Sequence, residues 1–169
     1  MKRIRLRMER IPILHLRAIG FIRRNPLHRP MASANVRFKP RLLETPAAEP
    51  AAARAHFEAK LAFESDPSDV RFDQQNSPGT FTVVDCRSPE SFAKRHLPGA
   101  VNIPYRTMDA TTTAGLPKDK LVVAYCTSVA CNASTKGAAR LSALGFRVKE
   151  MVGGIDAWEA EGYPVEKGA

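Results

Sequence analysis

The chain has 169 residues, of which 44% are hydrophobic, so it has room for one domain of ordinary size with a buried core and a tail. Its three cysteines, without any C-x-x-C pair, argue against a disulfide-stapled secreted domain and favour a reducing compartment. The net charge of +9 comes almost entirely from residues 1–30, which carry nine Lys or Arg against Glu9 alone, so charge gives no reason to expect a nucleic-acid partner for the remainder.

Residues 1–30 are rich in arginine and almost free of acidic side chains. Their most apolar run, residues 11–22, is interrupted by His15 and Arg17 and is too short to span a bilayer. Two explanations stay open: an organellar targeting peptide, or an extension without function upstream of a true start at Met31. We favour the second and expect a cytoplasmic protein. The prediction is a disordered extension over residues 1–55, basic and then Ala/Pro-rich, followed by one domain over residues 56–169.

Three elements are predicted before the first motif. Apolar residues at helical spacing predict a helix over residues 54–63. The pair Asp66-Pro67 is typical of a helix N-cap followed by proline at the first helical position, and predicts a second helix. After a turn signal at residues 77–79, the β-branched run TFTVVD over residues 80–85 predicts a buried strand.

The stretch Leu121–Phe146 predicts a strand, a loop and a helix in succession. Residues 121–125 are apolar and β-branched, and an alanine-rich segment with helical spacing follows a short polar loop. Cys126 therefore lies where a buried strand ends. In parallel α/β sheets, ligands bind beyond the carboxyl ends of the strands, and the N–H groups of the loop and helix favour negative charge there. We therefore expect the Cys126 thiol to be ionised, with its pKa lowered from about 8.5.

Four motifs occur in an order that resembles the rhodanese-like domain family. They are D-x-R after a strand (Asp85 and Arg87), H-x-P-G-A-x-N-I-P over residues 96–104, a cysteine that ends a later strand, and Gly153-Gly154 followed by Trp158. The resemblance covers residues 56–166. It implies an α/β fold of three layers, with a mostly parallel central sheet and helices on both faces. It also implies that Cys126 is a catalytic cysteine that takes a sulfane sulfur as a persulfide and needs no cofactor.

The loop after Cys126 departs from the family pattern. The predicted substrate-binding loop is about two residues longer than the tight loop of active family members, and consists of Thr127, Ser128, Val129, Ala130, Cys131 and Asn132. A wider loop resembles that of the related phosphatases and arsenate reductases. Those enzymes place arginine six positions after the nucleophile, where this chain has Asn132. Phosphoryl transfer would then lack the cation that stabilises its developing charge, so this activity is disfavoured.

Several residues near the motifs have a structural as well as a functional interpretation. Arg87 is expected to pair with Glu90 or Asp85, or else to face the anion site. Lys136 is either solvated or adds positive potential near the pocket. Cys131 either resolves a modified Cys126 or points into the interface between sheet and helix.

Three further residues are expected to be structural. Cys86 should be a small buried hydrophobe, His96 a turn residue and Trp158 a packing residue. The cysteines and His96 have no paired spacing of the kind that holds zinc, so no metal site is expected.

The sequence thus predicts a sulfurtransferase that passes a sulfane sulfur from Cys126 to a thiol or cyanide acceptor. Two alternatives stay open: a non-catalytic binding or sensing module, and thiol-disulfide chemistry through Cys126 and Cys131. The expected partners are a small sulfur donor, the acceptor and, as a further candidate, a sulfur-relay protein. No nucleic acid and no membrane are expected. The pocket rim selects the donor and acceptor, so the motifs leave both open, together with the oligomeric state.

Overall fold

The computed structural model describes residues 40–168 of the chain. A short 3-10 helix, η1 (Arg41–Leu43), belongs to a unit that ends at Thr45, and the elements described below belong to a second unit that begins at Pro46. The predictions made for residues 1–39 lie outside the described residues. None of the described helices combines the length and the apolar character needed to cross a membrane.

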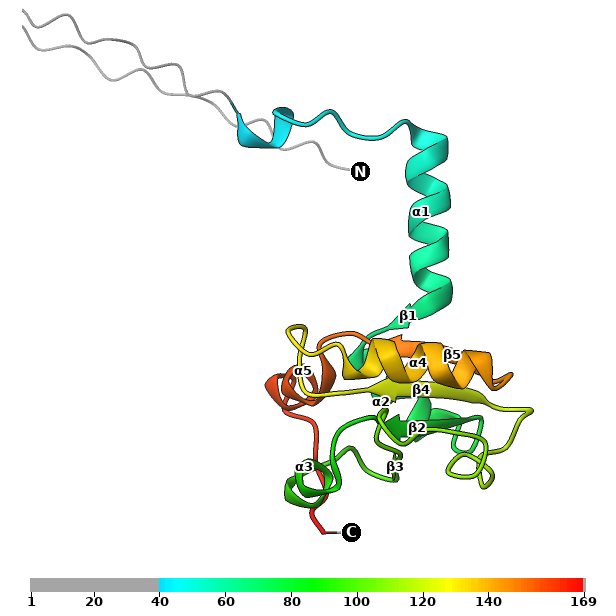
Figure 1. The fold of residues 1–169 in the computed structure, drawn as a ribbon. Helices are drawn as coiled ribbons and strands as arrows, with labels where there is room; N and C mark the ends of the chain where they lie inside the picture. Colours follow the sequence, from blue (N-terminus) through cyan, green and yellow to red (C-terminus); the bar gives the residue numbers. More distant parts are fainter. Residues whose placement is uncertain (1–39, 169) are drawn as a thin grey trace, which may run out of the picture. The chain divides into compact units, whose positions relative to one another are not determined.

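A five-stranded parallel sheet forms the centre of the second unit (Figure 1). Its strands, in chain order, are β1 (Glu64–Ser65), β2 (Phe81–Asp85), β3 (Val101–Asn102), β4 (Leu121–Tyr125) and β5 (Arg147–Met151). They lie in the order β1-β5-β4-β2-β3, so that β4 is the central strand and pairs with β5 on one side and β2 on the other. The strands predicted over residues 80–85 and 121–125 are therefore present as β2 and β4.

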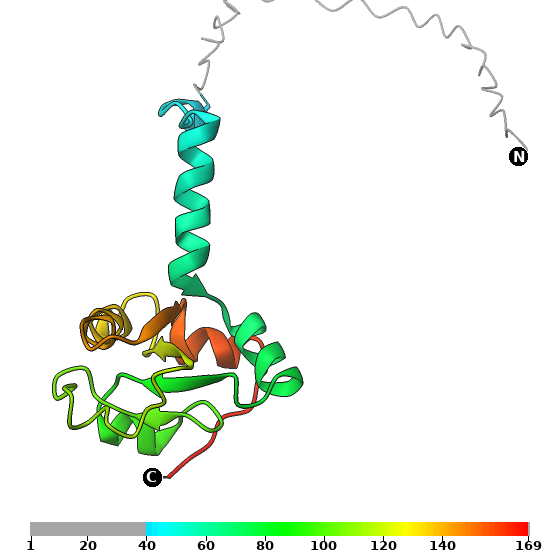
Figure 2. The same ribbon diagram turned by 90° about the vertical axis from the view of Figure 1, so that its right-hand side faces the viewer.

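Helices lie on both faces of the sheet, as the α/β prediction requires. The helices of this unit are α1 (Pro50–Phe63), α2 (Pro67–Asn76), α3 (Pro89–Lys94), α4 (Ala133–Ala143) and α5 (Gly154–Ala160). Of these, α1 has no buried residue and extends away from the sheet (Figures 1 and 2). Figure 2 shows α4 on one side of the strands and α2 and α5 on the other. Successive strand side chains point to opposite faces, so each strand supplies both cores. Val84 and Val122 pack with Leu141 of α4, whereas Val83 and Val123 pack with Trp158 of α5.

Both predicted N-terminal helices are present. The first begins at Pro50 rather than at residue 54, with proline at a position that needs no hydrogen bond from its nitrogen. The second, α2, is capped by Asp66, whose carboxylate accepts a hydrogen bond from the N–H of Asp69 at 2.9 Å. Trp158 is fully buried and donates from its indole nitrogen to the carbonyl of Pro164 at 2.8 Å, which confirms its predicted packing role.

Candidate active site

Cys126 lies at the carboxyl end of the central strand β4. The carbonyl of Cys126 accepts a hydrogen bond from the N–H of Ile155 at 3.0 Å, which brings the start of α5 against the end of β4. A Cβ atom at Gly154 would lie 2.4 Å from this carbonyl, and Gly154 has a φ of +59°. Glycine is therefore required at this position, because a side chain would separate α5 from the loop that follows Cys126. The close approach explains one half of the Gly153-Gly154 motif.

The predicted substrate-binding loop turns back on itself before α4 begins. The N–H of Cys131 donates to the carbonyl of Ser128 at 3.0 Å, which closes the turn, and the side chain of Val129 at its tip is 82% exposed. Ala130 and Asn132 are also exposed, whereas Thr127, Ser128 and Cys131 are half-buried. The loop therefore keeps Thr127, Ser128 and the Cys131 thiol partly buried, and it exposes its apolar tip and Asn132.

The Cys126 thiol is buried, with only 1% of the residue exposed. Its S–H donates to the carbonyl of Cys131 at 3.0 Å, and the hydroxyl of Ser134 lies 2.9 Å from the sulfur. Burial raises the pKa of Cys126, the Ser134 hydroxyl opposes this shift and the neighbouring Cys131 adds to it. Burial of the sulfur outweighs the hydroxyl and the N–H of Ser134, which both lower the pKa of Cys126, so the shift is opposite in direction to the lowered pKa that the sequence predicted.

N–H groups of the loop and of the start of α4 also act on Cys131. Partial burial of this thiol opposes ionisation, but the N–H of Ala133, the side chain of Cys126, the N–H of Thr127 and the charge of Arg87 together lower the pKa of Cys131. N–H groups thus favour the thiolate at both cysteines, and the net direction of the pKa shift differs because Cys126 is the more deeply buried. The direction of each peptide group depends on the loop conformation, which residue spacing alone does not determine.

The carboxylate of Glu150, which belongs to none of the four motifs, is linked to Cys126 through the hydroxyl of Ser134. Oε1 of Glu150 accepts hydrogen bonds from the Ser134 hydroxyl at 2.7 Å and from the Thr135 hydroxyl at 3.0 Å. Ser134 is 2% exposed, so its hydroxyl bridges the thiol of Cys126 and the carboxylate of Glu150 within the protein interior. Glu150 comes from β5, whose register pairs it with Ala124 of β4, two residues before Cys126. Glu150 on β5 is therefore close to the site around Cys126 at the end of the neighbouring strand β4.

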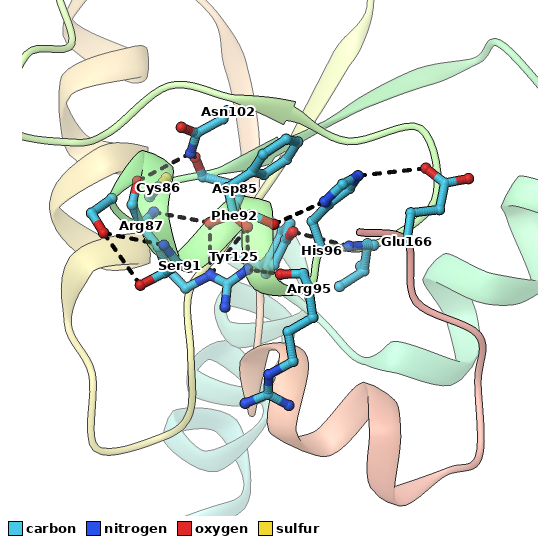
Figure 3. A network of polar contacts seen from close by, with 12 residues as sticks. Asp85, Cys86, Arg87, Ser91, Phe92, Arg95, His96, Asn102, Tyr125 and Glu166 are labelled. Carbon is cyan, nitrogen blue, oxygen red and sulfur yellow. Dashed lines mark hydrogen bonds and ion pairs between the residues drawn. The ribbon is translucent and has the colours of Figure 1, made fainter. Parts of the chain in front are cut away.

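The D-x-R motif forms a buried ion pair beside the cysteines (Figure 3). Asp85 is fully buried, and its carboxylate accepts from Nε of Arg87 at 2.9 Å and from the terminal nitrogen at 2.6 Å. The same terminal nitrogen donates to the carbonyl of Arg95 at 2.6 Å, and Asn102 donates to the carbonyls of both motif residues at 3.1 Å. Arg87 therefore pairs with Asp85, one of its two predicted partners, and fastens the segment after β2 to the chain near His96.

His96 and Cys86 occupy structural positions. The imidazole of His96 stacks on Phe92 with ring centroids 3.8 Å apart, and its Nδ1 lies 3.0 Å from the Phe92 carbonyl. Cys86 is 1% exposed and belongs to the core on the α4 face, as predicted. Burial, with the nearby charge of Asp85, raises the pKa of the Cys86 thiol far above its ordinary value. This thiol is held in its protonated form.

A pocket of about 520 Å³ opens beside the loop. Cys131, Thr127 and Arg87 form part of its wall, and its other lining residues are Cys86, Ser88, Pro89, Glu90, Ser91, Pro104, Tyr105, Arg106, Thr107 and Ala133. Lys136 is exposed, and its ammonium group lies 5.4 Å from the ring centroid of Tyr105. Lys136 and the exposed Arg106 are thus available to an anionic ligand at the rim, and Cys131 is the more accessible of the two loop thiols.

Within residues 40–168 no three His, Cys, Asp or Glu side chains form a group suited to a metal ion.

The fold and the four motifs agree with a known family, because the model of the rhodanese-like domain matches residues 69–161. The chain belongs to this family. A crystal structure of a Bacillus halodurans protein is similar to it, with a TM-score of 0.68 and 39% identity, over 70% of this chain and 87% of that one. A sulfurtransferase of Allochromatium vinosum is 36% identical over 84 residues, which cover 49% of this chain and 76% of that protein.

A third relative is a longer protein with a different name. An HTH-type transcriptional regulator of Mycobacterium tuberculosis is 35% identical over 91 residues, which cover 54% of this chain. The matched part makes up 40% of the regulator, so this chain spans less than half the length of that relative. The family model and the sulfurtransferase of Allochromatium vinosum support a rhodanese-type enzyme at the level of the family.

Proposed function

We propose that this chain is a sulfurtransferase in which Cys126 carries a sulfane sulfur as a persulfide and passes it to a thiol or cyanide acceptor. The observation that carries the proposal is the position of Cys126. It ends the central strand of a parallel sheet, where ligands of such sheets bind, and its sulfur has a buried hydroxyl at 2.9 Å. That hydroxyl can donate to the sulfur once it is ionised, so a thiolate at Cys126 has a ready partner.

The proposed donor is a small anionic sulfur compound, either thiosulfate or a persulfide. The pocket beside the loop has Arg106 on its wall and Lys136 near its rim, and both can attract such an anion. Arg87 contributes less, because Asp85 neutralises its charge in the buried ion pair. We expect slow turnover with thiosulfate for this reason, and faster turnover with a persulfide, whose single charge needs less compensation.

Two variants test the nucleophile. Cys126→Ser should abolish cyanide-dependent thiocyanate formation, because an alcohol is a much weaker nucleophile at neutral pH, whereas Cys86→Ser should retain most of it. Mass spectrometry adds a direct measurement. Residues 121–136 form one tryptic peptide, and in a Cys131→Ala background Cys126 is its sole thiol. This peptide should gain about 32 Da, the mass of one sulfur, after treatment with the donor.

The results separate the proposal from its rivals. Equal loss of thiocyanate formation in folded Cys126→Ser and Cys86→Ser would contradict the assignment of Cys126 as the nucleophile. A complete lack of mass gain and of thiocyanate with either donor would favour a non-catalytic binding module on the same fold.

A further inference from the structure

Two thiols of different character meet in the loop after β4. The carbonyl of Cys131 accepts a hydrogen bond from the S–H of Cys126 at 3.0 Å, and each of the two thiols shifts the pKa of the other. The turn closed between Cys131 and Ser128 folds the second cysteine back over the first. Both cysteines are free thiols. The two cysteines are therefore neighbours in space, as a disulfide between them requires.

The two thiols also differ in access and in charge. Cys126 is 1% exposed, whereas Cys131 is half-buried and lies on the wall of the 520 Å³ pocket. The N–H groups of Ala133 and Thr127 lower the pKa of Cys131, and so they favour the thiolate there. Cys131 lines this pocket whereas Cys126 does not, so an acceptor in the pocket meets Cys131 before a sulfur held on Cys126. Cys131 is also the loop thiol whose pKa is lowered.

We propose that Cys131 is a resolving thiol, which attacks the persulfide of Cys126 and releases its outer sulfur as hydrosulfide. The inference rests on the function proposed above. The Cys131 thiolate attacks the inner sulfur of the Cys126 persulfide, the bond between the two persulfide sulfurs breaks, and the outer sulfur leaves as HS⁻. The sulfane sulfur is reduced and the two cysteines are oxidised to a disulfide. A thiol reductant, such as glutathione or a dithiol protein, then restores both thiols.

This step gives the protein an activity distinct from sulfur transfer to an external acceptor. In the presence of a thiol reductant it would convert a sulfane sulfur donor into free hydrosulfide. The intramolecular attack competes well with dissolved acceptors, because the attacking group is held beside its target at a high effective concentration. Cys86 is unsuited to this role, since it is buried in the core and kept protonated.

The test uses the full chain in its reduced form, loaded with a persulfide donor and freed of excess donor and reductant. The wild-type protein should release about one hydrosulfide per chain, and its peptide 121–136 should become about 2 Da lighter than the dithiol. Cys131→Ser should keep the added sulfur on that peptide and release hydrosulfide at least about tenfold more slowly. Cys86→Ser is the matched control. It alters a cysteine on a different tryptic peptide, and it should behave as the wild type does.

The outcomes distinguish this inference from the function on which it rests. If Cys131→Ser gains a sulfur while the wild type also keeps its sulfur and forms no disulfide, Cys126 is a carrier and the resolving role of Cys131 is refuted. Hydrosulfide release by Cys131→Ser at the wild-type rate would refute it as well. If no variant gains a sulfur on peptide 121–136, the persulfide function fails and the resolving step fails with it. A thermal unfolding curve for each variant verifies that it is folded.

Discussion

At the scale of single residues, the hydroxyl of Ser134 is the group on which the reactivity of Cys126 depends most directly. A hydroxyl has one proton, so Ser134 donates either to Glu150 or to the Cys126 sulfur at a given moment. While Cys126 is a thiol, the Glu150 carboxylate is the better acceptor. Once Cys126 is ionised, the same hydroxyl can turn to the thiolate. Ser134 is therefore a positioning residue that lowers the pKa of Cys126 against the effect of burial.

Replacement of this hydroxyl gives the first prediction. Ser134→Ala should raise the pKa of Cys126 further and slow the uptake of sulfur from a persulfide donor about tenfold, since a hydrogen bond to a charged group contributes about 1.5 kcal/mol or more. The loss should shrink at higher pH, where the thiolate forms without help. The measurement is the pH profile of the single-turnover rate of sulfur uptake.

Thr135→Ala provides a matched control for this variant. Thr135 also donates to Oε1 of Glu150, at 3.0 Å, but from an exposed position. Its removal should leave the pH profile of sulfur uptake unchanged. An identical shift of the profile in both variants would show that the effect runs through Glu150 and would contradict the role given to Ser134.

The pKa shifts of the three cysteines give the second prediction. A thiol with a lowered pKa is ionised at lower pH, so Cys131 should react with iodoacetamide first as the pH is raised from about 6 to about 9. Cys126 should follow, because burial raises its pKa, and Cys86 should react after both. Fragment masses of peptide 121–136 distinguish the two loop cysteines. Faster labelling of Cys126 than of Cys131 throughout this range would contradict the arrangement of N–H groups described above.

At the scale of elements, the contact between α4 and the sheet fixes how the loop enters the helix. Gly137 lies on the buried side of α4, where a Cβ atom would come within 2.4 Å of the Cys86 sulfur. A glycine inside a helix costs roughly 0.5–1 kcal/mol relative to alanine. Its presence here is explained by the close approach of α4 to the end of β2, which also sets the distance from the start of α4 to Cys126.

The third prediction follows from this contact. Gly137→Ala should lower the free energy of unfolding by about 0.5–2 kcal/mol, because overpacking costs about 1–3 kcal/mol and the gain in helix propensity returns only about 0.5–1 kcal/mol of it. Chemical denaturation measures the change. The loss should be smaller in a Cys86→Ala background, where the contacting sulfur is absent.

Gly115→Ala is the control for this variant, since a Cβ atom at Gly115 would meet no atom within 4 Å. It should change stability by no more than about 0.5 kcal/mol. A stability of Gly137→Ala equal to or above that of the wild type would mean that α4 can move away from the sheet at little cost.

At the scale of the whole molecule, the family match and both hydrophobic cores lie in the part of the chain that follows the basic segment. The match begins at residue 69, and the first buried core residue is Val70. The fourth prediction is that a chain starting at Met31 has the same thermal unfolding temperature and the same rate of thiocyanate formation as the full chain. A large loss of folded protein on this deletion would show that residues 1–30 contribute to stability.

Local patterns in the sequence were sufficient for the elements and for much of the site. The apolar runs predicted β2 and β4, Asp66 predicted the cap of α2, and the order of four motifs identified the family. These features depend on residues close together in the chain, or on motif order, so spacing alone reveals them. The pairing of Arg87 with Asp85 is likewise a contact between residues two positions apart.

The tertiary structure decided in which direction the pKa of each loop cysteine shifts and which carboxylate belongs to the site. Glu150 lies sixteen positions from Ser134 and enters the site because β5 is paired in parallel with β4. The N–H groups of Ala133 and Thr127 lower the pKa of Cys131, whereas burial raises that of Cys126 although the hydroxyl and N–H of Ser134 lower it. Both shifts depend on how deeply each sulfur is buried and on the backbone torsions of the loop, which residue spacing does not determine.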